Sequence, residues 1–156
     1  MKMSAINEVV SLIANIGVIG SIVFLGLEMQ QNTAMMQSQT RNSIVENQLS
    51  YYERVIDSID FARVATAFRA NGDAYEAGTA EDYQYSLYSL SQLRMWENEF
   101  YQYQIGLFDS DEFEARTNTW KRQISYANVN GIWTRVQDSF APDFQIYLNE
   151  IIDEIS

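Results

Sequence analysis

Residues 9–27 read VVSLIANIGVIGSIVFLGL, a run of 19 residues without a charged side chain. As a helix rising about 1.5 Å per residue, this run would extend roughly 28 Å, close to the thickness of a bilayer's hydrocarbon core. A helix that is apolar on every face is unusual as the core of a small domain. A cleaved signal peptide is the alternative, but the run is longer than is usual for one and no clear cleavage site follows it. The run therefore predicts an uncleaved transmembrane helix.

Small and polar residues within this run predict that the anchor self-associates. Gly17-x-x-x-Ser21 has the spacing that lets two helix backbones approach closely in lipid. The candidate contact residues are Ala14, Asn15, Gly17, Gly20 and Ser21. Because glycine is common in membrane helices, the same residues are also compatible with a single, unpaired helix.

The composition excludes several classes of function. The chain has 10 basic and 21 acidic residues among 156, a net charge of −11, and this field repels nucleic acid. It contains no cysteine and no histidine, so disulfides, thiolate metal sites and Ser-His-Asp triads are excluded. We predict a protein that is not an enzyme, with no catalytic residue, no metal, no cofactor and no nucleic-acid partner.

The rest of the chain has the pattern of an all-α protein. Seven glycines and one proline favour long helices. We predict a transmembrane anchor at residues 1–28 and a helical stalk with the first bundle helix at 29–57. Residues 58–156 are predicted to form the helical bundle, which has four to five helices. Apolar residues expected to face the bundle from its first helix are Ile44, Val45, Leu49, Tyr52 and Ile56.

Capping residues and breaks predict where the later helices begin and end. The expected helices are one after Ser58 ending near Gly72, one from 80 to 105 after Thr79, one from 111 to 126 after Ser110, a short one after a break at 128–131, and one starting at Pro142. The apolar stripe of the second of these runs through Leu90, Leu93, Trp96, Phe100, Tyr103 and Leu107.

Charges beside the anchor give a preference for its orientation. Lys2 precedes the anchor, and the first basic residue after it is Arg41. The positive-inside rule then favours an inner N-terminus and an external acidic domain. We predict a single-pass protein of a bacterial inner membrane with its soluble domain in the periplasm. The alternative is a cytoplasmic domain.

Three short motifs resemble a bacterial family of short membrane-anchored helical proteins of no known function. They are Leu27-Glu28-Met29-Gln30-Gln31-Asn32-Thr33, then Arg94-Met95-Trp96-Glu97-Asn98-Glu99-Phe100-Tyr101-Gln102 with Gly106-Leu107-Phe108-Asp109, and Phe140-Ala141-Pro142-Asp143-Phe144. The resemblance extends over nearly the whole chain and implies the same architecture. Members of the family often have arginine at the position of Gln30, where a basic residue would favour a cytoplasmic domain.

Arg94, Glu97, Asn98 and Tyr101 are the candidate ligand-pocket residues. On a helix they lie three or four residues apart and share one face beside an aromatic stripe. They are predicted either to line a pocket for a small ligand or to form a hydrogen-bonded network that fixes the helix against its neighbours. The second reading is the more common for such groups.

Two further groups of residues have a structural and a functional reading. The carboxylates of Asp109, Asp111, Glu112 and Glu114 could hold Ca²⁺, but their spacing fits the start of a helix better. The tyrosine-rich segment 83–103 contains more tyrosines than one core can take, which indicates an interface.

The leading functional hypothesis is a membrane-anchored, self-associating scaffold or interaction protein, whose partners are the lipid bilayer and further copies of the same chain. The alternative is a small-ligand-binding sensor or an accessory subunit of a larger membrane complex.

Overall fold

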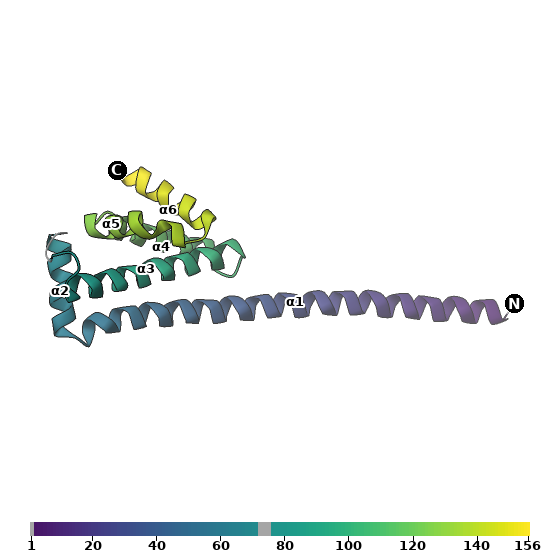
Figure 1. Ribbon diagram of the computed structural model, residues 1–156. Helices are drawn as coiled ribbons and strands as arrows, with labels where there is room; N and C mark the ends of the chain where they lie inside the picture. The colour runs from purple at the N-terminus through teal and green to yellow at the C-terminus, as the bar shows by residue number, and fades with distance from the viewer. Residues whose placement is uncertain (1, 72–75) are drawn as a thin grey trace. The chain divides into compact units, whose positions relative to one another are not determined.

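Helix α1, Lys2–Ile56, is continuous in the computed structural model, which describes residues 2–71 and 76–156 (Figure 1). The expected continuation of the anchor into a stalk is therefore present as one helix. No glycine or proline follows Gly26 in α1, so nothing in the stalk interrupts its ladder of hydrogen bonds. The chain divides into two units, Met1–Gln39 and Thr40–Ser156, and α1 contributes to both.

The N-terminal unit contains the apolar part of α1 and the polar residues that follow it up to Gln39. By length and composition, α1 is the one helix in the described part of the chain that is able to cross a membrane. None of the residues in its most apolar stretch is buried among the described residues. Its side chains, from Val9 to Leu27, are exposed all round the helix.

The second unit is a helical bundle. Its helices after α1 are α2 (Ile59–Ala70), α3 (Ala80–Gln104), α4 (Ser110–Ile124), α5 (Ala127–Val136), the 3₁₀ turn η1 (Gln137–Ser139) and α6 (Pro142–Ile155). The described residues contain no strand. The prediction of an all-α protein with an apolar N-terminal helix and a small bundle is confirmed.

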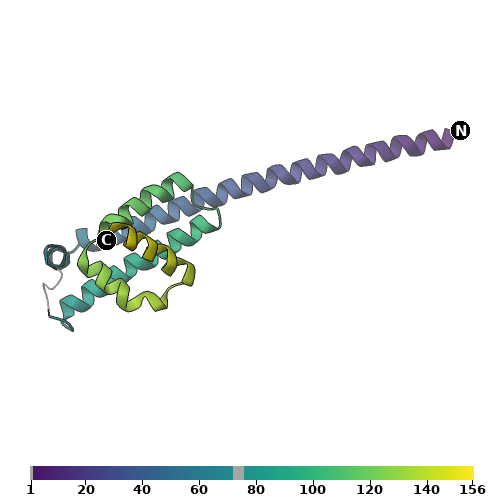
Figure 2. The same ribbon diagram turned by 90° about the horizontal axis from the view of Figure 1, so that it is seen from above.

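Helix α3 is the centre of this bundle. It packs against α2, α4 and α5, and it runs alongside the last part of α1 in both views of the chain (Figures 1 and 2). Side-chain hydrogen bonds from Gln48 to Glu99 and from Arg54 to Ser91 join α1 to α3. Helix α6 closes the bundle over α4. Any site on α3 is therefore positioned by three or four neighbouring elements.

Several predicted helix ends are confirmed. The hydroxyl oxygens of Ser58 and Thr79 accept hydrogen bonds from the N–H groups of Phe61 and Asp82, three residues into α2 and α3. Pro142 occupies the first turn of α6. The predicted end of α2 near Gly72 lies outside the described residues, and the helix ends at Ala70.

The cap of α4 differs from the prediction. Asp109, and not Ser110, precedes the helix, and its Oδ1 accepts hydrogen bonds from the N–H groups of Asp111 and Glu112 at 2.9 and 3.3 Å. Gly106, at φ +76°, ends α3 in a Schellman motif, with Leu107 N–H donating to the carbonyl of Gln102. The short link that follows leaves the carboxylate of Asp109 beside the first turn of α4.

The predicted break at 128–131 is wrong, because α5 runs through it from Ala127 to Val136. Glycine inside a helix costs only about 1 kcal/mol relative to alanine. Val129, Ile132 and Trp133 bury their side chains on this helix, which outweighs the cost of Gly131. The chain turns instead at Ser125 and Tyr126, where α4 ends.

The predicted bundle-facing stripe of α1 is wrong for four of its five residues. Ile44 is buried, but Val45, Leu49, Tyr52 and Ile56 are 46, 54, 44 and 76% exposed. The stripe that faces the bundle is formed by Ile44, Gln48, Tyr51 and Val55. Both stripes have helical spacing, so the sequence pattern does not distinguish them. The exposed one remains as an uncovered apolar surface, named here the outer face of α1.

The α3 polar network and the neighbouring groove

The interior of the bundle is filled by aromatic rings. Trp96 and Trp120 stack with their centroids 5.3 Å apart, and Phe144 lies edge-on to Trp120. Trp96, Trp120, Trp133 and Phe144 are almost completely buried. The predicted stripe of α3 is confirmed at Leu93, Trp96 and Phe100, is partly buried at Leu90 and Leu107, and is exposed at Tyr103.

Within this apolar interior lies a carboxylate, Glu99, with no exposed surface. Its Oε1 accepts hydrogen bonds from Gln48 Nε2 at 3.0 Å and from Arg116 Nη2 at 3.0 Å. Its Oε2 accepts bonds from Arg116 Nε at 3.1 Å and from Trp120 Nε1 at 3.2 Å. The network joins α1, α3 and α4. A buried charge with an ion-pair partner and satisfied lone pairs is tolerated in a protein interior, and its role here is to hold three helices in place.

The importance of Glu99 was not predicted from the sequence. A signal was available, because Glu99 follows Trp96 by three residues and therefore lies on the buried face of α3. Gln92, another buried polar residue, lies seven residues earlier on this face and hydrogen-bonds Gln123 of α4. Polar residues at buried positions of an aromatic stripe indicate partners on neighbouring helices.

Arg94 and Glu97 form an exposed-to-half-buried ion pair on α3, with 2.8 Å between Nη1 and Oε2. Arg94 Nη2 also donates to the carbonyl and hydroxyl oxygens of Ser139, and its guanidinium lies 3.9 Å from the ring centre of Phe140. Glu97 Oε1 accepts the N–H of Ala141 at 2.7 Å. The pair therefore holds the turn between η1 and α6 against α3.

Asn98 and Tyr101, the other two candidate pocket residues, do not join this ion pair. Asn98 lines a surface groove between α1 and α3, together with Arg94, and the groove has a volume of about 270 Å³. Tyr101 is 54% exposed and is not among the described residues that line this groove. The four candidates are thus divided between a structural network and the wall of an open groove.

Tyr51 and Tyr88 form the contact of α1 with α3 at one end of this groove. Their rings stack with centroids 4.3 Å apart, and a hydrogen bond links their side chains. Burial raises the pKa of Tyr51, and the adjacent Tyr88 raises it further. Burial also raises the pKa of Tyr88. Both groups are neutral hydrogen-bonding groups at physiological pH, and neither has the lowered pKa of a catalytic base.

The excess of tyrosine on α3 is distributed between core and surface. Tyr85 and Tyr88 are buried, whereas Tyr83, Tyr101 and Tyr103 are exposed. Tyr103 stacks on Phe113 with centroids 4.1 Å apart and so shields the core from solvent. The expectation that one core cannot take all of these rings is confirmed, and the interface they were expected to form stays a prediction.

The predicted contact residues of the anchor are all exposed: Ala14, Asn15, Gly17, Gly20 and Ser21. The hydroxyl of Ser21 donates to the carbonyl of Gly17 at 2.8 Å, so this polar group is satisfied within its own helix. A Cβ placed at Gly17 or Gly20 would meet no atom within 4 Å among the described residues. The helix surface at these glycines is open to close approach.

The acidic residues that follow α3 form a helix start. Asp109 caps α4 through two backbone N–H groups, and Glu112 pairs with Arg41 at 2.9 Å. In the described part of the chain, no group of three or more acidic side chains converges in a way that could hold a metal ion. Helix capping therefore accounts for these residues.

Comparison with known proteins gives no assignment: no protein-family model, curated protein or solved structure matches this chain.

Proposed function

We propose that this protein is a membrane-anchored interaction protein that self-associates along α1 and has no catalytic activity. The observation that carries the proposal is the outer face of α1, formed by Val45, Leu49, Tyr52 and Ile56. No part of the described bundle covers these four side chains. Contiguous apolar surface of this kind marks an interaction site in a soluble domain.

The spacing of the outer face favours another copy of α1 as its partner. The residue numbers 45, 49, 52 and 56 alternate steps of four and three, which is the pattern of a coiled-coil seam. Continued toward the N-terminus in steps of seven, the seam passes through Ser38 and Asn42, Gln31 and Met35, Phe24 and Glu28, and Gly17 and Ser21. The small pair of the anchor and the outer face of α1 therefore belong to one heptad register.

The polar members of this register support pairing of a defined kind. An asparagine at a seam position, here Asn42, favours a single register and a small number of helices in the coiled coil, and it lowers the stability of the coiled coil somewhat. Gly17 and Ser21 allow the close approach that helices need in lipid, where apolar side chains give no hydrophobic driving force. Glu28, the one charged residue of the register, lies at the expected boundary between lipid and water.

The membrane location is part of the proposal. It is supported by the exposed, uncharged surface from Val9 to Leu27, which is unfavourable in water and favourable in lipid. A signal sequence near the N-terminus has the same length and composition. We place the protein in a bacterial inner membrane, with the bundle on the periplasmic side, as the position of Lys2 favours.

A role without catalysis is supported by the state of the polar groups in the bundle. Both oxygens of Glu99 are occupied by donors from Gln48, Arg116 and Trp120. Glu97 is held by Arg94 and by the backbone of Ala141. Neither carboxylate is free to move a proton to or from a substrate, and the sequence has no histidine or cysteine to do so.

The test is native mass spectrometry of the full-length protein extracted from membranes in a mild detergent. We expect one oligomeric mass whose subunits retain residues 9–27. Leu49→Glu should shift the protein toward the monomer, because it places a charge in the seam. Ile146→Glu is the matched control: Ile146 is 60% exposed on α6, so this change should leave the oligomer intact. A monomer over the whole accessible concentration range would refute self-association, and subunits lacking the apolar run would refute the anchor.

The alternative function, a small-ligand-binding sensor or an accessory subunit of a membrane complex, is supported by a different observation. Arg94 and Asn98 line an open groove between α1 and α3. In the same mass spectrum this alternative predicts an additional subunit or a bound small molecule.

A further inference from the structure

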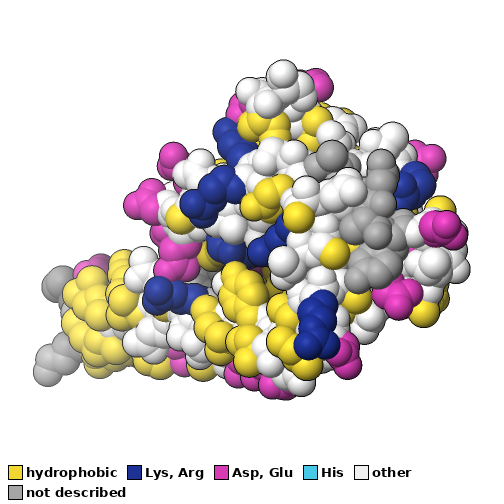
Figure 3. Space-filling model, turned by 90° about the vertical axis from the view of Figure 1, so that its left-hand side faces the viewer, with side chains coloured by type: hydrophobic (Ala, Val, Ile, Leu, Met, Phe, Trp, Pro, Cys, Tyr) yellow, Lys and Arg dark blue, Asp and Glu magenta, His cyan; other side chains and the backbone are white. Residues whose placement is uncertain are grey.

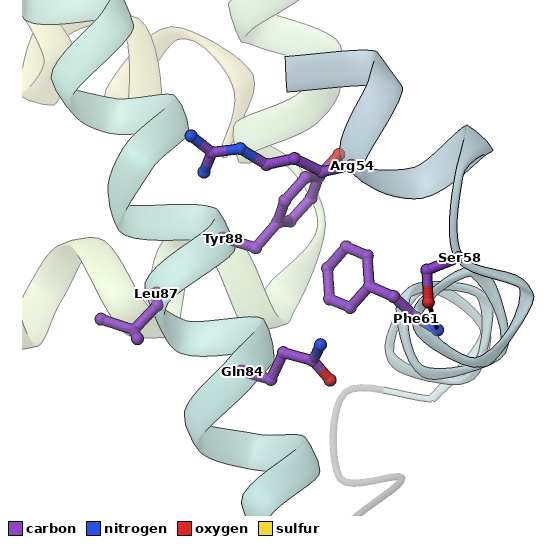
Figure 4. Close-up of a pocket in the computed structure, with 6 residues that line it drawn as sticks. All are labelled: Arg54, Ser58, Phe61, Gln84, Leu87 and Tyr88. Carbon is purple, nitrogen blue, oxygen red and sulfur yellow. Dashed lines mark hydrogen bonds between the residues drawn. The ribbon is translucent and has the colours of Figure 1, made fainter. Parts of the chain in front are cut away.

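Two neighbouring pockets lie along the contact between α1 and α3 and share one wall, Arg54. The first, of about 270 Å³, includes Asn47, Ser50, Ser91 and Asn98 in its lining. The second, of about 300 Å³, is formed by Arg54 with Ser58, Phe61, Gln84, Leu87 and Tyr88 (Figure 4). Together they form a surface groove with Arg54 near its middle, named here the Arg54 groove.

The lining of the Arg54 groove is uncharged or basic, although the protein as a whole is acidic. None of the described residues that line either pocket is an aspartate or glutamate, whereas the chain has 21 such residues against 10 basic ones. Arg94 also lines the groove, but its guanidinium is held by Glu97 and Ser139. The uncompensated positive charge of the groove is therefore that of Arg54.

Arg54 has no carboxylate within ion-pair distance among the described residues. Its one hydrogen bond there is from Nη1 to the hydroxyl of Ser91, at 3.3 Å. Five other cationic side chains of the described chain do form ion pairs: Arg41–Glu112, Arg63–Asp60, Arg94–Glu97, Arg116–Glu99 and Lys121–Glu154. The guanidinium thus keeps donors available for an anion.

The second pocket adds an apolar wall beside this charge. The rings of Phe61 and Tyr88 meet edge to face with centroids 5.0 Å apart, and both project into the space below the Arg54 side chain in Figure 4. Leu87, 47% exposed, completes the apolar side. Figure 3 shows yellow hydrophobic surface next to dark-blue arginine or lysine groups on the end of the bundle that carries α2. The arrangement suits a molecule with one charged and one apolar end.

We propose that the Arg54 groove binds a small organic anion with an apolar or aromatic body. The anionic head, a carboxylate or a phosphate, accepts hydrogen bonds from Arg54, with the hydroxyl of Ser50 and the amide of Asn98 available as further donors. The body packs on Phe61, Leu87 and Tyr88. The proposal does not depend on self-association, because the residues of the outer face of α1 line neither pocket.

The size and the charge of the ligand follow from the surroundings. The two pockets together would hold a molecule of drug-like size. The net charge of −11 would repel a large polyanion such as a nucleic acid. A small ligand with a single anionic group beside Arg54 is repelled much less. The described lining offers a cation no carboxylate, so it favours an anion instead.

The experiment is isothermal titration of the full-length protein in nanodiscs of zwitterionic lipid. The probe is 4-phenylbutyrate, and the matched ligand control is its uncharged amide. We expect the acid to bind about tenfold more tightly than the amide, since charge-assisted hydrogen bonds are roughly twice as strong as neutral ones. Arg54→Gln should remove this difference. Arg63→Gln changes the net charge equally but lies outside the groove, so it should preserve the difference. Leu87→Ala should weaken binding of both ligands.

The proposal is overturned if the acid binds no better than the amide, or if Arg54→Gln and Arg63→Gln have the same effect. It is also overturned if neither ligand binds. A second titration in discs containing an anionic lipid separates two sources of the head group. If the anionic lipid weakens binding of 4-phenylbutyrate, and Arg54→Gln abolishes this competition, a lipid head group is an occupant of the groove. If the anionic lipid leaves binding of 4-phenylbutyrate unchanged, the groove takes its anions from water. Both results support the groove as an anion site.

Discussion

The guanidinium of Arg116 donates two hydrogen bonds to the buried carboxylate of Glu99, at 3.1 Å from Nε to Oε2 and 3.0 Å from Nη2 to Oε1. Arg116 comes from α4 and Glu99 from α3, and the carboxylate also receives Gln48 from α1. One ion pair therefore determines how three helices meet around the aromatic core. The geometry is directional, because the planar guanidinium matches both carboxylate oxygens at once.

The first prediction concerns this pair. Glu99→Gln should lower the free energy of unfolding by about 3 kcal/mol, because it leaves the Arg116 charge largely buried without an anion. Guanidinium-chloride unfolding of the full-length protein in mild detergent, followed by circular dichroism, measures the change. Glu114→Gln, at an exposed position on α4, is the control and should change stability by less than about 0.5 kcal/mol. Equal effects of the two substitutions would mean that the pair contributes nothing to stability.

The second prediction concerns the contact of Glu97 with the turn before α6. Glu97→Ala removes the acceptor of the Ala141 N–H and the partner of Arg94. We expect faster hydrogen exchange of the amides from Ser139 to Gln145 and a loss of about 1–2 kcal/mol of stability. Mass-spectrometric hydrogen exchange measures this segment separately. Glu150→Ala, at an exposed position of α6, should leave its exchange unchanged; acceleration spread evenly over all helices would contradict a local role.

The third prediction is a dependence of stability on alkaline pH. Burial, reinforced by Tyr88, raises the pKa of Tyr51 above its ordinary value of 10.0. Between pH 10 and this raised pKa, the unfolded chain releases a proton that the folded chain retains, so the free energy of unfolding falls as pH rises. The contribution of Tyr51 is complete below pH 10 and is lost through the alkaline range.

Tyr51→Phe should therefore make the slope above about pH 10 shallower, by up to about 1.4 kcal/mol per pH unit. Unfolding by denaturant at several pH values between 8 and 11.5, a range set by the ordinary tyrosine pKa of about 10, gives the slope. Tyr83→Phe, which alters a tyrosine that is 66% exposed, serves as the control. An unchanged slope in Tyr51→Phe would show that this tyrosine is not the origin of the alkaline loss.

The fourth prediction contrasts two glycines. Gly131 lies inside α5, where an added Cβ would meet only Arg135 Nη1 at an ordinary distance of 3.9 Å. Gly131→Ala should raise the melting temperature by a few degrees, since it gains about 0.5–1 kcal/mol of helix stability. Gly106→Ala should lower it by a similar amount, because Gly106 has φ +76°. Thermal unfolding followed by circular dichroism compares the two, and shifts of the same sign would contradict the assigned backbone roles.

The fifth prediction identifies the cap of α4. Asp109→Ala should cost about 1 kcal/mol of unfolding free energy, because two N–H groups lose their acceptor. Ser110→Ala should cost less than half as much, since this residue is already inside the helix. Denaturant unfolding of both variants measures the two losses of unfolding free energy. A larger loss in Ser110→Ala than in Asp109→Ala would identify Ser110 as the cap.

Local chemistry in the sequence was sufficient for much of this fold. Nineteen uncharged residues define the apolar helix. Ser58, Thr79 and Pro142 act on neighbours within three residues, so the starts of α2, α3 and α6 can be read from the sequence. The buried rings of Trp96, Trp120 and Phe144 follow from helical spacing, because each belongs to a stripe too apolar to face water.

The tertiary structure alone decided which stripe of α1 faces the bundle, that Glu99 is buried, and that Arg54 has no carboxylate partner among the residues that the structure describes. Each of these depends on residues far away in the chain: Gln48 lies 51 positions from Glu99, and Ser91 lies 37 from Arg54. Helical spacing describes how residues are arranged around one helix and carries no information about the neighbour that covers it. A charge is tolerated in the interior only when a distant partner reaches it, and a surface charge is left without a partner only when no carboxylate does.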